Sequence, residues 1–169
     1  MRKPPFYLTK SRFKLALECP TKLFYTDKNE YANKKEADEF LQALAEGGFQ
    51  VGELAKRYFP DGYDVKPLDY KNSLSETNDK LKMDNIAIYE AAIQFEQFFI
   101  RVDVLNKNGN DVELIEVKAK SFNPIDTDFK YKRSKYIRPG WRPYLFDVAF
   151  QTWVTKQAFP DWNVTPYLM

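Results

Sequence analysis

The chain has 169 residues, 44% hydrophobic and 17% aromatic, which is enough for one domain with a core of ordinary size and excludes a disordered chain. Lys and Arg number 26 against 24 Asp and Glu, so the net charge of +2 does not indicate a polyanionic partner, and only local clusters can do so. The chain has no histidine and one cysteine, Cys19, which excludes Ser-His-Asp and Cys-His triads, histidine zinc sites and an internal disulfide.

The N-terminal segment, residues 1–35, is basic and aromatic. Within it, we expect Thr9 or Ser11 to cap a short helix that runs through Glu18 and ends at Pro20. The simplest interpretation of its charges is a surface helix with one packed face.

Residues 36–58 carry apolar side chains near the 3.6-residue period of a helix. Gly47-Gly48 interrupts this pattern. Because a glycine lowers helix stability by about 1 kcal/mol relative to alanine, we expect a break or a close backbone approach there. The Pro-Asp-Gly sequence at residues 60–62 predicts a turn, and residues 64–72 predict a loop or a short strand. Ser73-Leu-Ser-Glu76 fits a capping box that starts the next helix.

Three consecutive strands are predicted in the middle of the chain, over residues 85–91, 98–105 and 112–118. The last two flank a tight-turn signal, Asn108-Gly109-Asn110, and are therefore expected to form a β-hairpin. The order of helices and strands predicts one α/β domain with a central mixed sheet flanked by helices.

The hairpin turn decides which side chains face one another. A two-residue turn, at Asn108-Gly109 or at Gly109-Asn110, puts Asp103 on the same sheet face as Glu116 and Lys118, and the second choice puts Asp103 directly opposite Glu116. A three-residue loop sends the two carboxylates to opposite faces unless a bulge intervenes. Two facing carboxylates need a cation beside them, and a divalent metal ion would supply it.

Asp103, Glu116 and Lys118 have the spacing of a metal-dependent phosphodiesterase hairpin. The carboxylates would hold Mg²⁺ or Mn²⁺ through hard oxygen ligands, and the backbone carbonyl of Val117 is a further candidate ligand. The Lys118 ammonium would orient the attacking water and offset negative charge in the transition state. The same pattern also fits a cross-strand salt bridge between Lys118 and Asp103 or Glu116.

Residues 122–142 form a basic and aromatic segment in which prolines and a glycine prevent a long helix. A helix over residues 144–157 and a strand over residues 163–169 are predicted after it. Cations that neutralise phosphates beside rings that stack on bases suit a groove for single-stranded nucleic acid, although a solvated loop is the alternative. The expected nucleic-acid contacts are Lys120, Lys130, Tyr131, Lys132, Arg133, Lys135, Tyr136, Arg138, Trp141 and Arg142.

Four segments in this order resemble the successive motifs of PD-(D/E)XK nucleases, and most nearly those of the RecB-like branch that includes the exonucleases of CRISPR adaptation: residues 88–93, 100–103, 114–120 and 147–151. The opening residues 8–25 are also similar to the start of an uncharacterised bacterial family in that branch. The resemblance implies a restriction-endonuclease-like core and metal-dependent hydrolysis of DNA in repair, recombination or defence.

The resemblance also implies the site. It makes Asp103 and Glu116 metal ligands, Lys118 the catalytic lysine, Glu90 an acidic residue near the metal, and Gln151 a residue that lines the substrate groove. Three positions depart from the family pattern: the usual glycine is Ile100, the usual tyrosine is Thr155, and the histidine of the long helix is absent, which leaves Glu53 as its nearest substitute.

Structural roles are the alternatives for several of these residues. Glu53 fits a solvated or salt-bridged helix position, Glu90 an edge charge, and Arg101 a partner for a carboxylate or for phosphate. Asp147 is expected to hydrogen-bond along its helix face with Gln151. For the whole chain, the alternatives are a catalytically inactive nucleic-acid-binding module on the same fold, or a protein-interaction domain.

No apolar run approaches the roughly 18 residues of a membrane span, and residues 1–5 are not followed by the apolar core of a signal peptide, so we expect a cytoplasmic protein with no membrane partner. In relatives, a cysteine at the position of Cys19 joins three C-terminal cysteines around an iron–sulfur cluster. Those partners are absent here, so no cluster is expected. The apolar ending at Met169 predicts that residues 1–169, a basic segment (1–35) and a nuclease-like core (36–169), are a fragment of a longer chain.

Overall fold

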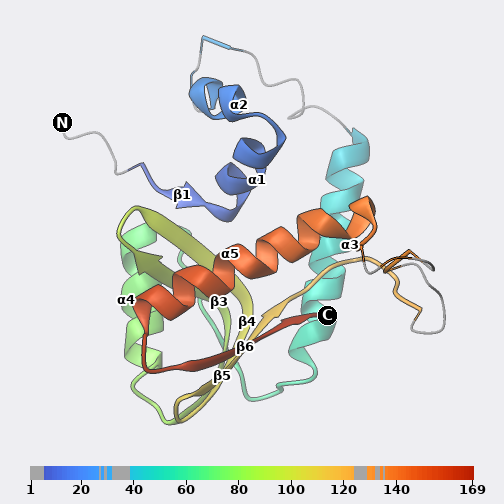
Figure 1. Ribbon diagram of the computed structural model, residues 1–169. Coiled ribbons are helices and arrows are strands. Elements are labelled where there is room, and N and C mark those ends of the chain that lie inside the picture. The colour runs from blue at the N-terminus through green and yellow to red at the C-terminus, as the bar shows by residue number, and fades with distance from the viewer. Residues whose placement is uncertain are drawn as a thin grey trace.

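The computed structural model describes residues 6–26, 28, 30–31, 39–123, 129–131, 134 and 136–169, with the backbone alone for residues 39–46. The chain forms one mixed six-stranded sheet with helices packed beside it (Figure 1), which confirms the expected α/β class. The elements, in chain order, are β1 (Leu8–Thr9), α1 (Lys10–Glu18), α2 (Pro20–Tyr25), α3 (Glu39–Lys56), β2 (Tyr63–Asp64), α4 (Tyr70–Lys80), β3 (Asn85–Phe95), β4 (Phe98–Asn108), β5 (Asp111–Glu116), the 3-10 turn η1 (Pro139–Trp141), α5 (Arg142–Ala158) and β6 (Asn163–Leu168).

The strands follow the order β2-β3-β4-β5-β6 across the sheet. The pairs β3–β4 and β4–β5 are antiparallel, whereas β2 runs parallel to β3 and β6 parallel to β5. The short β1 pairs in parallel with the start of β4, at Phe98 and Phe99. Because α1 begins directly after β1, this pairing brings the first turn of α1 to the middle of the sheet.

The hairpin has the second of the two predicted two-residue turns. Asn108 pairs with Asp111, so Gly109 and Asn110 form the turn, and Gly109 has a φ of 58°, in the left-handed region that glycine adopts without strain. The register continues along the strands to the pair Val104 and Ile115. The next position of this register sets Asp103 beside Glu116.

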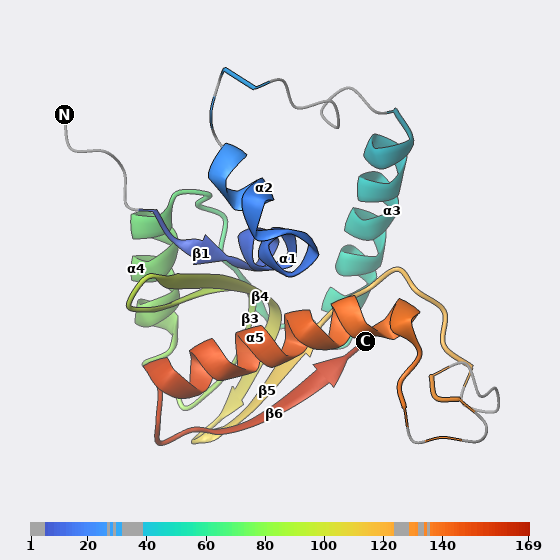
Figure 2. The ribbon, with the colours of Figure 1, turned by 45° about the horizontal axis from the view of Figure 1, so that its top comes forward.

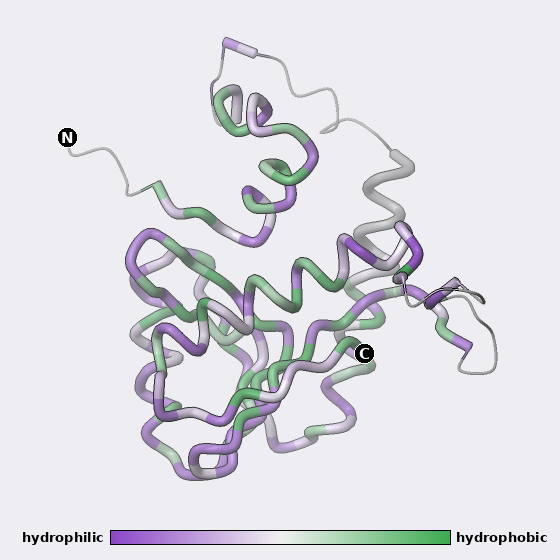
Figure 3. The backbone as a smooth tube through the Cα atoms, in the orientation of Figure 1, coloured by the Kyte–Doolittle hydropathy of each residue, from purple (hydrophilic) through white to green (hydrophobic). Residues whose placement is uncertain are grey.

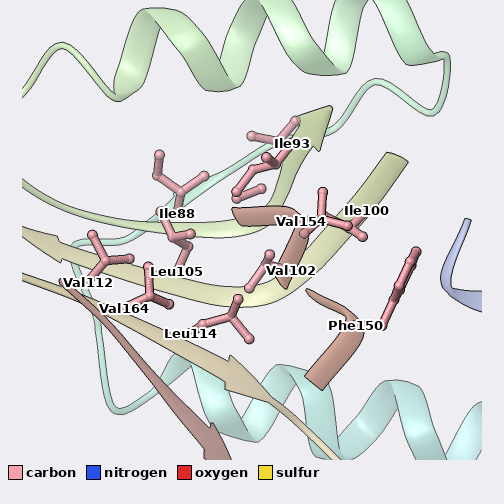
Figure 4. Close-up of a cluster of buried hydrophobic side chains, with 12 residues drawn as sticks. Ile88, Ile93, Ile100, Val102, Leu105, Val112, Leu114, Phe150, Val154 and Val164 are labelled. Atoms are coloured by element: carbon pink, nitrogen blue, oxygen red, sulfur yellow. The ribbon is translucent and has the colours of Figure 1, made fainter. Parts of the chain in front are cut away.

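Alternation along the strands divides the core between two faces of the sheet. On one face, Ile88, Leu105 and Leu114 pack with Phe150 and Val154 of α5 (Figure 4). On the other face, a smaller cluster brings Ala55 of α3 against the remaining strand residues, which are Tyr89, Val104 and Ile115. The central strands are largely hydrophobic, and the turns at their ends are hydrophilic (Figure 3).

Helix α1 lies next to α5 above the first of these faces (Figure 2). Phe13 of α1 stacks on Phe150 of α5, with ring centroids 4.4 Å apart. The Thr9 side chain accepts a hydrogen bond from the Arg12 backbone N–H, so Thr9 is the N-cap, the first of the two predicted candidates. The packed helix pair is what holds the N-terminal segment against the sheet.

Several predicted boundaries are wrong. Helix α3 continues through Gly47-Gly48, and an added Cβ at either glycine would meet no atom of the described residues, so neither the predicted break nor the predicted close approach is found. Pro20 begins a second helix as well as ending the first, since proline is well placed in a first turn. Helix α4 starts at Tyr70 and not near Ser73, because Asp69 caps it by accepting from the Asn72 backbone N–H at 2.9 Å.

The last two elements agree with prediction. Helix α5 carries Pro143 in its first turn, and β6 follows it as a strand. In the part of the chain that the structure describes, no helix combines the length and apolar character needed to span a bilayer.

Candidate active site

The site is built on the end of the central hairpin. Asp103 lies within β4, Glu116 is the last residue of β5, and Lys118 follows two positions later. Glu116 is fully buried, whereas the Asp103 side chain is 23% exposed. Asp103 Oδ2 accepts a hydrogen bond from the backbone N–H of Val117 at 2.8 Å, which fixes one carboxylate against the neighbouring strand.

A lysine from α1 bridges the two carboxylates. Lys10 Nζ lies 3.3 Å from Asp103 Oδ1 and 3.1 and 3.0 Å from the two Glu116 oxygens. One ammonium group therefore supplies the cation that two facing carboxylates require. The basic pattern of residues 1–35 predicts a surface charge at Lys10, and this prediction is wrong. The sequence feature that indicates a further cation such as Lys10 is the unequal charge of the hairpin, where two facing acids have only one lysine.

Two further helical residues complete the cluster. Gln151 of α5 donates from Nε2 to Glu116 Oε2 at 2.6 Å, and Lys118 Nζ is also paired with Glu116. Asp147 of α5 is fully buried, and its Oδ2 lies 2.5 Å from Lys14 Nζ and 4.0 Å from Lys118 Nζ. The Asp147 side chain is thus paired with a lysine of α1 and not with Gln151. Gln151 contacts only the backbone carbonyl of Asp147, at 3.4 Å. The cluster contains three carboxylates and three ammonium groups, so its charges balance.

The environment shifts the ionisation of three groups. Burial opposes the charge on Lys10, but the attraction of Asp103 and Glu116 outweighs it and raises the pKa of Lys10. Burial would likewise raise the pKa of Glu116, but Lys10, Lys118 and Gln151 hold it below its usual value. For Asp103, burial is decisive and raises the pKa despite Lys10. Glu116 is therefore the more acidic carboxyl of the pair.

Two cavities open beside the cluster. The larger, of about 810 Å³, is lined by Asp103, Lys118 and the glycine-containing face of α3. The smaller, of about 420 Å³, is lined by Lys10, Tyr70 and Phe99. Asp103 borders both cavities, so a ligand in either one can reach its carboxylate, whereas Glu116 lines neither.

Glu90 lies where the β3–β4 pairing skips a position, between the pairs Tyr89–Val104 and Ala91–Val102, and has a φ of 55°, a strained backbone conformation for glutamate. Its Oε2 accepts from Arg101 Nε at 3.1 Å, and Arg101 also donates to the carbonyls of Val65 and Pro67. Arg101 is thus a partner of a carboxylate, one of its two predicted roles.

Glu53 lines the larger cavity and forms an ion pair with Lys56 at 2.7 Å. Among the described residues, no three acidic or cysteine side chains lie close enough to form a metal cluster. The roles of Glu53 as a metal ligand and of Glu90 as an acidic residue near the metal stay predictions, and in this structure the two side chains pair with Lys56 and Arg101. Thr155 is fully buried and donates from its hydroxyl to the Gln151 carbonyl at 2.8 Å, so it does not face a groove.

The predicted nucleic-acid segment is described in part. Lys132, Arg133 and Lys135 lie outside the described residues. The backbones of Lys130 and Ile137 pair in an isolated antiparallel β-bridge, and the guanidinium group of Arg138 lies over the ring of Tyr131. Tyr136 is 73% exposed, Tyr131 is 48% exposed, and Arg142 is exposed.

The expectation that Trp141 is an exposed ring is wrong. Trp141 is 5% exposed because it packs against Phe122, Phe129 and Tyr144. Lys120 Nζ lies 4.8 Å from the centroid of the Trp141 ring. Trp141 therefore packs inside the segment, and Phe122, Tyr131 and Tyr136 are exposed aromatic residues of its described part.

No family model, no curated protein and no solved structure matches this chain. What the site can do therefore follows from its own geometry. Asp103 and Glu116 already share one cation, and carboxylate oxygens are the donors that Mg²⁺ and Mn²⁺ prefer. Mg²⁺ is usually held by one or two carboxylates, with waters and substrate phosphate as its other ligands, so this pair fits a catalytic divalent cation.

Proposed function

We propose that this chain is a metal-dependent nuclease of the PD-(D/E)XK type that hydrolyses phosphodiester bonds of DNA. The observation that carries the proposal is the shared cation position: Asp103 and Glu116 both contact a single ammonium group, and Lys118 is paired with the same Glu116. Two acids and a lysine arranged around one cation position beside an open cavity are what such chemistry requires.

In this proposal, Asp103 and Glu116 hold Mg²⁺ or Mn²⁺, with the Val117 carbonyl as a further candidate ligand. The metal would polarise the phosphate and acidify the attacking water. Lys118 orients that water and offsets the negative charge that develops on the phosphate oxygens. Gln151 keeps Glu116 in place through the hydrogen bond to Oε2. It acts as a positioning residue.

The exposure of Lys118 supports a role beyond its salt bridge with Glu116. The buried Asp147 already has Lys14 as its partner, and Glu116 already has Lys10 and Gln151. Lys118 is 22% exposed and lines the larger cavity, so its ammonium can reach a ligand there.

DNA is the proposed substrate because Lys130, Tyr131 and Tyr136 offer cationic and aromatic contacts. A catalytically inactive DNA-binding module is the second candidate. It is favoured by the same Lys10 contact, since a resident ammonium group neutralises the two acids without any metal.

The test uses labelled single- and double-stranded DNA incubated with Mg²⁺, with Mn²⁺ or with a chelator. We expect metal-dependent cleavage by the wild-type chain and a loss of about 100-fold or more in Lys118→Ala. Lys82→Ala is the matched control, because Lys82 is 75% exposed and pairs with Asp79 on the surface. Binding of DNA without cleavage at any metal concentration would favour the inactive module, and cleavage that persists in the chelator would refute the metal-dependent mechanism.

A further inference from the structure

We infer that Lys10 is a resident counter-ion that competes with the divalent metal for Asp103 and Glu116, and that its ammonium group must withdraw before the metal binds. The inference deepens the proposed function, on which it rests, by identifying a residue outside the hairpin that sets the metal affinity of the site.

The contacts of the four carboxylate oxygens make the two cations mutually exclusive. Three of these oxygens, Asp103 Oδ1 and both oxygens of Glu116, lie within 3.3 Å of Lys10 Nζ. The fourth, Asp103 Oδ2, accepts from the Val117 N–H. A divalent cation would bind the same oxygens at about 2.0–2.6 Å and would stand almost on the ammonium position. Two cations at that separation repel each other strongly in a buried site.

Lys10 can leave without unfolding the site. It is the first residue of α1, its side chain is 23% exposed, and it lines the smaller cavity next to Asp103. A lysine side chain has four flexible carbon–carbon bonds, so a rotamer change moves the ammonium group into that cavity. Meanwhile α1 keeps its own anchors, the Lys14–Asp147 ion pair and the ring stack of Phe13 on Phe150.

The competition has a measurable consequence. The wild-type chain must give up the contacts of Lys10 when it binds metal, whereas a chain without this charge does not. We expect Lys10→Met, which keeps the length of the side chain and removes the charge, to bind Mn²⁺ about tenfold or more tightly than wild type. Lys10→Arg keeps the charge and should show no such gain.

Lys22→Met is the matched control. Lys22 lies on the adjacent helix α2 and its loss changes the net charge equally, but its partner is Glu18 on the surface and not the carboxylate pair. The Mn²⁺ affinity of Lys22→Met should stay within about threefold of wild type, because an exposed charge away from the site is screened and changes binding only weakly.

The experiment measures Mn²⁺ binding to each full-length variant by titration calorimetry and by the loss of the free-ion electron paramagnetic resonance signal. Thermal unfolding with and without Mn²⁺ gives a second readout, in which Lys10→Met should gain more stability from the metal than wild type does. If Lys10→Met does not fold without metal, Lys10→Gln, which keeps a hydrogen-bond donor, takes its place. A tighter Kd for Mn²⁺ in Lys10→Met or Lys10→Gln, without a similar change in Lys10→Arg or in the control, supports the inference.

An Mn²⁺ affinity that is unchanged or weaker in folded Lys10→Met and Lys10→Gln overturns the inference. The outcome is separable from that of the proposed function. Metal-dependent cleavage by wild type with no gain of affinity in Lys10→Met would refute the competition and leave the nuclease standing. A gain of affinity without any cleavage would support the competition and refute the nuclease. Absence of Mn²⁺ binding in every variant would refute both.

Discussion

Glu116→Gln is the substitution that most directly tests whether the charge cluster holds this fold together. Glu116 is fully buried and contacts Lys10, Lys118 and Gln151. The glutamine has nearly the same shape and still offers one carbonyl oxygen, so packing is preserved. What is lost is the negative charge that two neighbouring ammonium groups share.

The magnitude follows from what each ammonium group retains. Removing one partner of a buried ion pair destabilises a protein by about 3–5 kcal/mol. Here both lysines are about a fifth exposed, Lys10 keeps Asp103, and Lys118 keeps Asp147 at 4.0 Å. We therefore expect a smaller loss, about 2–3 kcal/mol in the free energy of unfolding. For a chain of this length that corresponds to a fall in Tm of about 4–12 °C.

The assay is urea unfolding and thermal unfolding without metal, with Glu113→Gln as the control. Glu113 lies on the same strand, is half-buried and accepts from Asn106 Nδ2 at 2.8 Å, so its substitution should change stability by about 0.5 kcal/mol or less. An equal stability of Glu116→Gln and wild type would refute the view that this buried charge is held by its partners.

The pH dependence of stability gives a second test of the same prediction. Because the pKa of Glu116 is held below its ordinary value of 4.5, its charge contributes stability above that pH, and the contribution is lost as the pH falls through the lowered pKa. The difference between wild type and Glu116→Gln should therefore be largest near neutral pH and shrink in strong acid. A difference that grows in acid would contradict the assigned sign.

Three further substitutions test the packing, each measured by urea unfolding. Gly62→Ala should lower stability by about 1–3 kcal/mol, because its Cβ would overlap the ring of the buried Tyr89, and wild-type stability would contradict this close approach. Gly47→Ala should raise stability by about 1 kcal/mol, since α3 is continuous there and the space is open, whereas a loss would indicate a hidden contact. Thr77→Val should lower stability by about 1–3 kcal/mol, because the buried N–H of Ala92 loses its acceptor, and no change would show that the group finds another.

The hairpin was predictable because local chemistry decides it, whereas its register was left open between two two-residue turns and a three-residue loop, and the structure selects Gly109-Asn110. Gly109 adopts a positive φ without strain, and a two-residue turn fixes the face on which Asp103 and Glu116 lie. The N-cap at Thr9 and the start of α5 near Pro143 were local in the same sense. Such features depend on residues a few positions apart, and the sequence displays them directly.

The second half of the site was not predictable in this way. Lys10 is separated from Glu116 by more than a hundred positions, and nothing near Lys10 in the sequence distinguishes it from the other lysines of residues 1–35. What brings it to the acids is the pairing of β1 with β4, which involves only Leu8 and Thr9. A strand of two residues leaves too little pattern to be recognised, although it decides where α1 begins.

The origin of the cations in this cluster links its stability to its proposed chemistry. Two acids that face each other in a buried site repel unless a cation lies between them. A chain that folds before it binds metal therefore needs another cation at this position, or it loses stability. Lys10 provides that cation from a separate helix, whereas Lys118 comes from the same segment as the acids. A lysine fixed beside its acid can remain in place when metal arrives, but one delivered from outside can be exchanged. A site that is stable without metal and still able to bind it would require both kinds of lysine, one that can be displaced and one that stays.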